Sequence, residues 1–521
     1  MSFGKIIIVL TVITAAIMEM IDTTIVNVAL YHVSGSLGAS VEDASWVITA
    51  YAIANVIVIP LTGFFQKYFG RKNYFVGSII LFTVASFFCG TSTNLWELVF
   101  FRFLQGIGGG ALLSVSQGIL FDTFSVEQRP IASALFGMGI VMGPTLGPTL
   151  GGVIVDNFHW GWIFFVNVPI GIAAALLSIF FLEKSESEKN IDRKAISVDY
   201  IGLVLLCIGI GSLQYVLERG QEEDWFESRS ILYLFFTMAI GLLAFVFWEL
   251  KQEHPIVDLR VLKNRNLAVT TFFTFVVGFG LFTSVYAYPL MVQRVAGYTT
   301  TLTGISLITG SLVSIVIMPV VGRMMTKGIS PSLFVFIGMM AYVLFSFIMS
   351  LQSADTPYYS YMIILMLRGV GMSMLMVPLT NQAVVDLKPS EFPAGISMIN
   401  MIRQIGGSVG IAITNTWIAH RFAMHRNDLV TNISTDNPVY NTISDGITKN
   451  LLSQGVNALN APSAALKMIE MNVTKQAYLL SYLDTFFLVG VFFVAVLPLI
   501  VLLKNKSISQ EQAAKVAEES H

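Results

Sequence analysis

The sequence carries very little charge for its length. Only 12% of its 521 residues are charged, whereas 55% are hydrophobic; about 25% charged residues is usual in soluble proteins. So few polar side chains cannot cover the surfaces of the three or four soluble domains that this length would otherwise suggest. The composition therefore excludes a soluble multidomain protein.

Features that mark several other protein classes are also missing. The two cysteines, Cys89 and Cys207, lie inside apolar segments, which favours buried packing residues over a disulfide framework. No P-loop motif occurs, which excludes an ATP-driven pump, and no His-Glu-x-x-His or Gly-x-Ser-x-Gly motif supports a membrane enzyme. His420 and His425 each stand beside an arginine, which disfavours a metal site. We therefore expect no enzyme activity, no cofactor or metal and no nucleic-acid partner.

Apolar segments of about 20 residues recur along the whole chain. Each is long enough to cross a hydrocarbon core about 30 Å thick. The predicted fold class is an all-α polytopic membrane protein with fourteen spans, at residues 6–31, 45–65, 74–92, 97–120, 131–155, 161–182, 198–218, 230–248, 268–292, 303–325, 333–351, 359–384, 395–418 and 479–503.

The distribution of basic residues predicts the orientation. An even number of spans places both termini on one side of the membrane. Assigning both tails and the alternate short loops to that side collects most of the 30 lysines and arginines, whereas the opposite short loops hold only Arg219, Arg229 and Arg294. Short loops rich in Lys and Arg are typically cytoplasmic. Both termini are therefore predicted to be cytoplasmic, and the polar loop 419–478 to be an external cap, a docking surface or a plain solvated loop.

Two weak internal matches indicate a duplication. Pro60–Gly63 is similar to Pro319–Gly322, and Gln105–Gly108 is similar to Arg368–Gly371, at similar offsets that correspond to a shift of eight spans. Paired repeats around a midplane site are typical of secondary transporters. We therefore predict an N-terminal six-helix bundle (1–182), a linker with two inserted helices (183–267), a C-terminal six-helix bundle with its external loop (268–503) and a cytoplasmic tail (504–521).

Two carboxylic acids lie inside the first span. Glu19 and Asp22 are three residues apart, which places both carboxyl groups on one face of a helix. An ionised side chain at the bilayer centre costs about 2.5–3.5 kcal/mol, so at least one is expected to exchange its proton near neutral pH. Arg102 in the fourth span is the natural partner by analogy. The pair fits a proton carrier, and a purely structural pair bound to an arginine is the alternative.

The fifth span contains glycine at every fourth position and two prolines. This spacing aligns the glycines on one helix face for close packing, while each proline removes a backbone donor. We interpret the segment as a closely packed, kinked helix at a moving interface, formed by Gly139, Gly143, Pro144, Gly147, Pro148, Gly151 and Gly152.

Together these motifs resemble the fourteen-span drug:proton antiporters of the major facilitator superfamily. The resemblance covers essentially the whole chain. Its first four motifs are the first-helix signature, the fourth-helix arginine motif, the antiporter motif of helix five and the entry to helix six, at Met20–Leu30, Arg102–Gly106, Gly143–Gly152 and Trp160–Gly171. Asp224–Phe226 and Pro255–Leu259 are similar to the multidrug exporters of this family.

The resemblance implies export of hydrophobic, often cationic or weakly acidic toxic compounds across a bacterial inner membrane, driven by inward proton flow. It also implies a periplasmic adaptor and an outer-membrane channel as partners, with Asp22 as the coupling carboxylate and Arg102 as its modulating cation. A proton-coupled exporter or uptake symporter of a specific metabolite, and a sensor that does not transport, are the alternatives. The candidate residues of the substrate cavity are Asn27, Gln105, Gln117, Arg368 and Arg403.

The loop after the second span departs from the family pattern. It keeps the glycines and basic residues of the gating motif as Gly63, Gly70, Arg71 and Lys72, but the segment 67–68 reads Lys-Tyr where the family has Asp-Arg. A cytoplasmic lock based on a carboxylate is therefore not expected. A further hypothesis concerns Glu19, which would allow two protons to be exchanged per monovalent cation and so make export respond to voltage.

Overall fold

The computed structural model describes residues 3–183, 198–388, 391–431, 433–434 and 436–503. Within these ranges, fourteen helical segments are long and apolar enough to cross a membrane, and each one overlaps a predicted span. No strand occurs in the part of the chain that is described. The predicted fold class is confirmed. The linker residues 184–197 and the tail 504–521, which carry several of the basic residues used to predict the orientation, lie outside the described residues.

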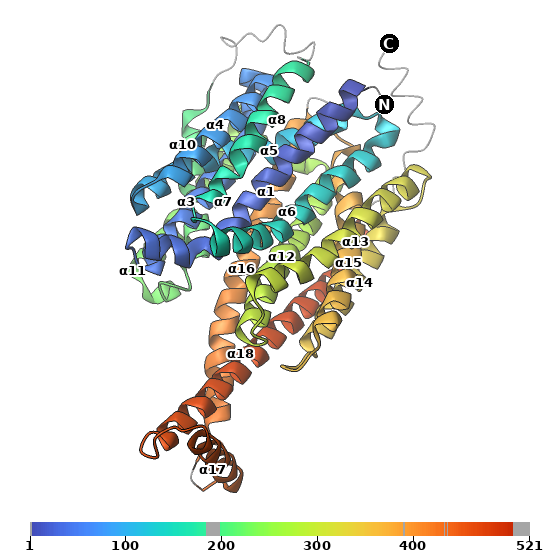
Figure 1. Cartoon of the computed structure of the whole chain (residues 1–521). Helices are drawn as coiled ribbons and strands as arrows, with labels where there is room; N and C mark the ends of the chain where they lie inside the picture. The colour runs from blue at the N-terminus through green and yellow to red at the C-terminus, as the bar shows by residue number, and fades with distance from the viewer. Residues whose placement is uncertain (1–2, 184–197, 389–390, 432, 435, 504–521) are drawn as a thin grey trace.

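The spans form two sets of six, and the chain passes through an additional helix pair after the first set (Figure 1). The first set is α1 (Phe3–Leu37), α3 (Trp46–Phe69), α4 (Arg71–Thr91), α5 (Leu95–Thr123), α6 (Arg129–Asn157) and α8 (Asn167–Phe181). The second set is α12 (Arg265–Arg294), α13 (Thr300–Thr326), α14 (Pro331–Ser350), α15 (Tyr358–Val385), α16 (Phe392–Val430) and α18 (Ala461–Val496). The inserted pair is α10 (Tyr200–Arg219) and α11 (Arg229–Lys251), and short helices include α2 (Val41–Ala44), α7 (Trp162–Phe165) and η3 (Trp225–Glu227).

The two sets repeat the same packing. Helix α1 contacts α5, α6 and α8, and α12 contacts α15, α16 and α18 in the same way. The pairs α3–α5, α4–α5 and α4–α8 likewise recur as α13–α15, α14–α15 and α14–α18. A shift of eight spans therefore relates the two halves, as the short sequence matches predicted.

Phe3 and Leu503 lie at the same side of the bundle because the number of spans is even; we call this side the terminal face and the other side the opposite face. The halves meet through α6 with α13 and α3 with α16. Near the terminal face, a Cβ at Gly63 of α3 would lie 3.4 Å from the backbone nitrogen of Ala394 in α16. The Arg129 guanidinium at the start of α6 also stacks over the ring of Phe392, 4.7 Å from its centroid.

The inserted helix α10 contacts both halves toward the opposite face. Gln214 donates a hydrogen bond to Ser408 of α16 (3.0 Å), and the Trp225 indole in η3 donates to Thr416 of the same helix (3.0 Å). On the other side, Arg219 donates to the Ser45 hydroxyl and to the Glu42 carbonyl (2.9 Å) in the N-terminal half. The helix pair therefore bridges the two halves beside their interface.

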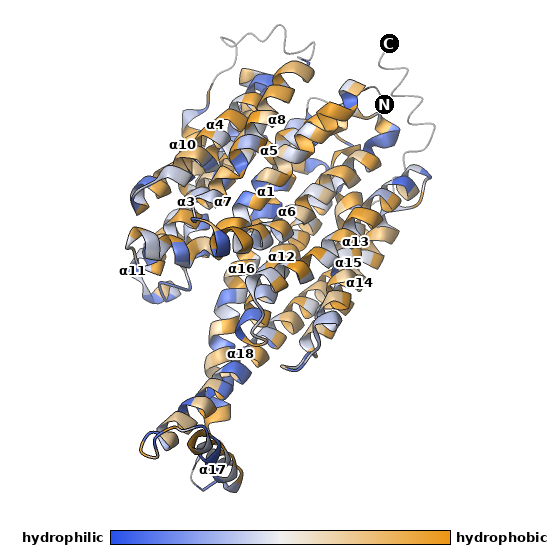
Figure 2. Cartoon of the chain, viewed as in Figure 1, coloured by the Kyte–Doolittle hydropathy of each residue, from blue (hydrophilic) through white to orange (hydrophobic). Residues whose placement is uncertain are grey.

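Helices α16 and α18 continue well beyond the bundle and carry α17 (Pro438–Ser453), forming a helical protrusion whose described residues are 419–431, 433–434 and 436–478 (Figure 1). Figure 2 shows more hydrophilic residues along the ribbon there than along most of the bundle. Arg421 and His425 of α16 both contact Asp484 of α18, at 2.5 and 2.7 Å, and hold the helices together. The segment is helical rather than a plain loop, because both spans extend past their predicted ends at 418 and 479.

Removing α17 is expected to leave the bundle stable. None of its residues is buried, and surface changes typically alter stability by about 0.5 kcal/mol or less. Replacing residues 432–459 by a short Gly-Ser linker should therefore move the unfolding temperature in detergent by no more than about 2 °C. Differential scanning fluorimetry would measure this, and a drop of about 10 °C would show that α17 supports the spans.

Candidate functional site

A buried ion pair joins Asp22 of α1 to Arg102 of α5. The Arg102 Nη1 lies 2.5 Å from the Asp22 Oδ2, and the two side chains are 1% and 0% exposed. Arg102 also donates to the Val47 carbonyl (3.2 Å) and stacks 4.1 Å from the centroid of the Tyr51 ring. The partnership predicted from the sequence is present.

Amide side chains complete the surroundings of Asp22. Gln105, one turn from Arg102, donates to the Asp22 Oδ1 (2.8 Å) and accepts from Arg102 (2.7 Å). Asn167 at the start of α8 donates to the same Oδ1 (2.8 Å). Gln105 also donates to Ser86 of α4 (2.7 Å). Because both carboxylate oxygens have charged or polar donors, Asp22 is a well-satisfied anion in this structure.

Glu19 has a different environment, although it lies one turn from Asp22. Its Oε1 accepts from Asn55 of α3 (2.9 Å) and more weakly from the Tyr51 hydroxyl (3.4 Å). Its Oε2 is buried without a hydrogen-bond partner, and the residue is 1% exposed. No cation forms an ion pair with it among the described residues. The two carboxyl groups on one helix face are therefore not equivalent.

Glycines of α5 allow α3 to bring Tyr51 and Asn55 to this site. A Cβ at Gly106 would lie 2.8 Å from the Ala54 Cβ, and one at Gly109 would lie 3.2 Å from the Asn55 amide nitrogen. A side chain at either position would separate α3 from α5. Gly106 and Gly109 thus allow close helix contact next to Gln105.

The glycine stripe of α6 packs directly on α1. Cβ atoms at Gly139, Gly143, Gly147 and Gly151 would meet the α1 residues Ile17, Met20, Thr24 and Ile25 in that order. Gly152 instead faces Thr300 of α13, and the helix continues through Pro144 and Pro148 as far as Asn157. The close face predicted from the four-residue spacing is present, and it holds the part of α1 that carries Asp22.

The loop motif after α3 makes contacts within the N-terminal half. Gly70 has a φ of 81°, a conformation that favours glycine. Arg71 forms an ion pair with Asp122 of α5, and Lys72 donates to the Ile179 carbonyl of α8 (2.7 Å). The basic residues of the motif thus link α4 to α5 and α8, and the acidic partner Asp122 lies outside the motif.

The candidate cavity residues do not gather in one place. Gln105 belongs to the Asp22 cluster, while Asn27 is exposed on α1 toward the opposite face. Gln117 accepts from Asn400 of α16 (3.1 Å), and Arg403 donates to the same Asn400 (2.9 Å). Arg368 is buried at a separate site, where it donates to Ser284 (3.1 Å). Among the described residues, neither Arg368 nor Arg403 has a carboxylate partner.

Sequence reasoning did not select several residues of the cluster. Tyr51, Asn55, Ser86 and Asn167 all contact the acidic pair or its partners, and Asn400 links Gln117 to Arg403. The sequence did contain a signal for them: each is a polar side chain inside an apolar span. A buried polar group needs a hydrogen-bond partner, so such residues are candidates for a shared polar cluster.

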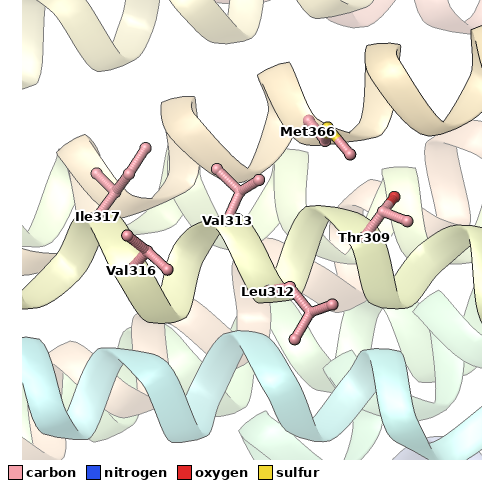
Figure 3. Close-up of a pocket in the computed structure, with 6 residues that line it drawn as sticks. All are labelled: Thr309, Leu312, Val313, Val316, Ile317 and Met366. Carbon is pink, nitrogen blue, oxygen red and sulfur yellow. The ribbon is translucent and has the colours of Figure 1, made fainter.

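The described residues also form an apolar groove between α13 and α15. Figure 3 shows Val313, Val316 and Met366 among its lining side chains, and Val316 is 68% exposed. In a membrane, acyl chains would fill such an apolar, outward-facing groove. No group of three or more potential metal ligands occurs in the described part of the chain.

The family comparison agrees with this architecture. The model of the Major Facilitator Superfamily matches residues 12–411, which include the acidic pair, Arg102 and the α6 glycine stripe. This chain belongs to the Major Facilitator Superfamily. Its fold and relatives are those of transporters, and the acidic pair lies inside a span of that transporter fold.

Relatives in the superfamily are named as export or resistance proteins. The chain is 35% identical to the multidrug export protein EmrB of Escherichia coli over 433 residues, which cover 81% of this chain and 82% of EmrB. It is 33% identical to the fatty acid resistance protein FarB of Neisseria gonorrhoeae over 94% of both chains. The chain is thus a superfamily transporter similar to the EmrB multidrug exporters.

A solved structure of low sequence identity supports the fold alone. The human organic anion transporter MFSD10 has a TM-score of 0.55 and 12% identity, covering 94% of this chain and 99% of that one.

Proposed function

We propose that this protein is a proton-coupled antiporter that exports hydrophobic and lipophilic toxic compounds across a bacterial inner membrane. In this proposal both termini are cytoplasmic, and the protein is the inner-membrane part of a tripartite pump with an EmrA-like periplasmic adaptor and an outer-membrane channel. The observation that carries the proposal is the buried Asp22–Arg102 pair inside the first helix of a transporter similar to EmrB.

The position of the pair suits coupling to the outer side of the membrane. Arg102 lies seven residues, or about 10 Å along the helix, from Leu95 at the opposite-face end of α5. One face of α1 is buried at Ala16 and Met20 but exposed at Asn27 and Tyr31, nearer that face. Near the terminal face, by contrast, α3 and α16 are in contact. We infer a conformation in which α3 and α16 close the terminal face, while α6 and α13 also stay in contact near the opposite face through Gly152 and Thr300.

Protonation of Asp22 would couple the proton to the substrate. A neutral Asp22 attracts Arg102 far less than a carboxylate does, which loosens the link between α1 and α5. One proton entering down about 100 mV and one pH unit releases about 3.7 kcal/mol, of which about 2.3 kcal/mol comes from the voltage. This energy supports a several-hundredfold gradient of a neutral substrate.

Buried cations favour acidic cargo alongside cationic drugs. Arg368 and Arg403 are 2% and 4% exposed and lack carboxylate partners among the described residues. A buried charge without a partner is costly, and a carboxylate on an amphiphilic substrate would supply that partner. The name of the relative FarB, a fatty acid resistance protein, is consistent with such cargo.

Proton release from acid-loaded everted vesicles tests the proposal. Adding ethidium should discharge the proton gradient in vesicles that contain the protein and not in matched vesicles without it. Collapsing the gradient beforehand with nigericin should stop accumulation of ethidium. Failure of a broad panel of lipophilic cations, anions and neutral drugs to release protons would contradict antiport, and accumulation in the reverse direction would indicate uptake.

A further inference from the structure

We propose that Glu19 is a second proton site, occupied in this conformation while Asp22 is ionised. This inference rests on the proposed antiport and adds to it the number of protons exchanged. It is carried by the unequal surroundings of two carboxyl groups that lie one turn apart on α1.

Glu19 is poorly prepared to hold a negative charge. An ionised carboxylate accepts about four hydrogen bonds, whereas Glu19 receives one good one from Asn55 and a long one from Tyr51, both at Oε1. Its Oε2 is buried and has no partner. A buried carboxylate without a cation or donors is strongly disfavoured, and a neutral acid is not. The geometry therefore places a proton on Glu19.

Asp22 has the donors that Glu19 lacks. Arg102, Gln105 and Asn167 all donate to it, at 2.5 to 2.8 Å. Because Arg102 forms its ion pair with Asp22, it does not neutralise Glu19. A negative charge on Glu19 would also be repelled by the Asp22 carboxylate one turn away. The pair as a whole thus favours one ionised and one protonated carboxyl group.

The groups that face Glu19 from the neighbouring helices are consistent with a protonated Glu19 beside an ionised Asp22. Its titratable and charged neighbours are Asp22 on α1, Tyr51 on α3 and Arg102 on α5. Helix α6 presents its glycine stripe to α1, and α8 presents the neutral Asn167. Arg102 stacks on the ring whose hydroxyl contacts Glu19, but its ion pair is with Asp22.

Release of the Glu19 proton together with the Asp22 proton would change the electrical balance of transport. Exchange of one proton for one monovalent cation moves no net charge. Exchange of two protons for one monovalent cation moves one net charge across the membrane. A voltage of 100 mV then multiplies the gradient of the exported cation by about fifty. The second carboxyl group therefore makes export of cations respond to membrane voltage.

Infrared spectroscopy tests the protonation state without requiring transport. The purified full-length protein in lipid should show the carbonyl stretch of a protonated carboxylic acid at neutral pH, and Glu19→Gln should lose that component. Glu19→Gln keeps the size of the side chain and an oxygen for Asn55 but cannot release a proton. Glu253→Gln, at an exposed position, is the matched control and should retain the band. An unchanged band in Glu19→Gln would overturn the proposal.

Reconstituted vesicles test the coupling with ethidium as the cation, after subtraction of the uptake by protein-free vesicles. An imposed voltage of 100 mV should increase its gradient about fiftyfold with the native protein and have no effect with Glu19→Gln, which should still exchange in response to a pH gradient. Voltage dependence that persists in Glu19→Gln would contradict a second proton site. If the native protein exchanges no protons with any substrate, the antiport fails, and the infrared result still decides whether Glu19 is protonated.

Discussion

Replacing Asp22 by asparagine is expected to abolish substrate-driven proton release in the everted-vesicle assay. The amide has the shape of a protonated Asp22 but cannot ionise, so the variant resembles a carrier locked in one protonation state. Of the contacts around Asp22, the 2.5 Å ion pair with Arg102 is the one that this change removes most completely. Proton release should fall to the level of vesicles without the protein.

The same substitution should lower stability, because it leaves the Arg102 charge buried without an anion. Breaking a buried ion pair by removing one partner costs about 3–5 kcal/mol. The double variant Asp22→Asn/Arg102→Met removes the orphaned charge and should recover much of the unfolding temperature while remaining unable to exchange protons. Recovery of stability without recovery of exchange would separate the structural role of the pair from its role in coupling.

Asp156→Asn provides the control for this prediction. Asp156 lies near the opposite-face end of α6, is exposed and accepts a hydrogen bond from the Thr300 hydroxyl, at 3.3 Å. Its replacement should leave proton release and stability near the native values. Native proton release in a well-folded Asp22→Asn protein would rule out Asp22 as a coupling carboxylate.

Gly147→Ala is expected to lower both stability and transport, although it adds only a single methyl group. The new Cβ would overlap the Thr24 hydroxyl and lie 3.0 Å from the Ile21 carbonyl oxygen and 3.1 Å from the Ile25 nitrogen. Alanine favours a helix over glycine by about 1 kcal/mol, yet overpacking costs about 1–3 kcal/mol, and two of these neighbours are backbone atoms that cannot rotate away. We therefore expect a net loss of stability.

The displacement of α1 should also reduce transport. Asp22 lies between Ile21 and Thr24, so a shift of α1 away from α6 moves the carboxylate relative to Arg102. A displacement of about 1 Å at a functional group can cost about a hundredfold in rate, and a loss of this order is expected in the ethidium-driven assay.

Gly77→Ala is the matched control, since Gly77 lies inside α4 and a Cβ added there would have no described atom within 4 Å. It should be neutral or slightly stabilising by helix propensity alone. Equal behaviour of the two variants in thermal unfolding and in transport would show that α6 does not need its close approach to α1.

The spans were predictable because the bilayer imposes strong local constraints. A backbone in hydrocarbon must satisfy its own hydrogen bonds, so an apolar run of sufficient length forms a helix with little dependence on its neighbours. All fourteen spans followed from this rule, and the spacing of Gly139 to Gly151 predicted the close face of α6. The rule does not apply outside the membrane, which is why the continuation of α16 and α18 into the helical protrusion was not predicted.

The contents of the site were only partly predictable. Analogy with related transporters led from Asp22 to Arg102, although 80 residues separate them in the chain, and the attraction of opposite charges in an apolar medium accounts for the contact. Nothing local marks Tyr51 and Asn55 as neighbours of Glu19, because that contact depends on how closely α3 approaches α1 and α5. The contacts of Gln105 with Asp22 and of Gln117 with Asn400 also depend on how the helices approach one another, so they were not predictable either.

The sequence by itself determined the membrane class, the number of spans, the repeat and the presence of two carboxyl groups on one face of α1, because these depend on composition and helical periodicity. Only the tertiary structure decided which donors each carboxyl group receives. Asp22 pairs with Arg102 and accepts hydrogen bonds from the amides of Gln105 and Asn167, whereas the Glu19 Oε2 has no hydrogen-bond partner. Spacing places both groups on one face, but their charge depends on which donors the other helices bring within about 3 Å.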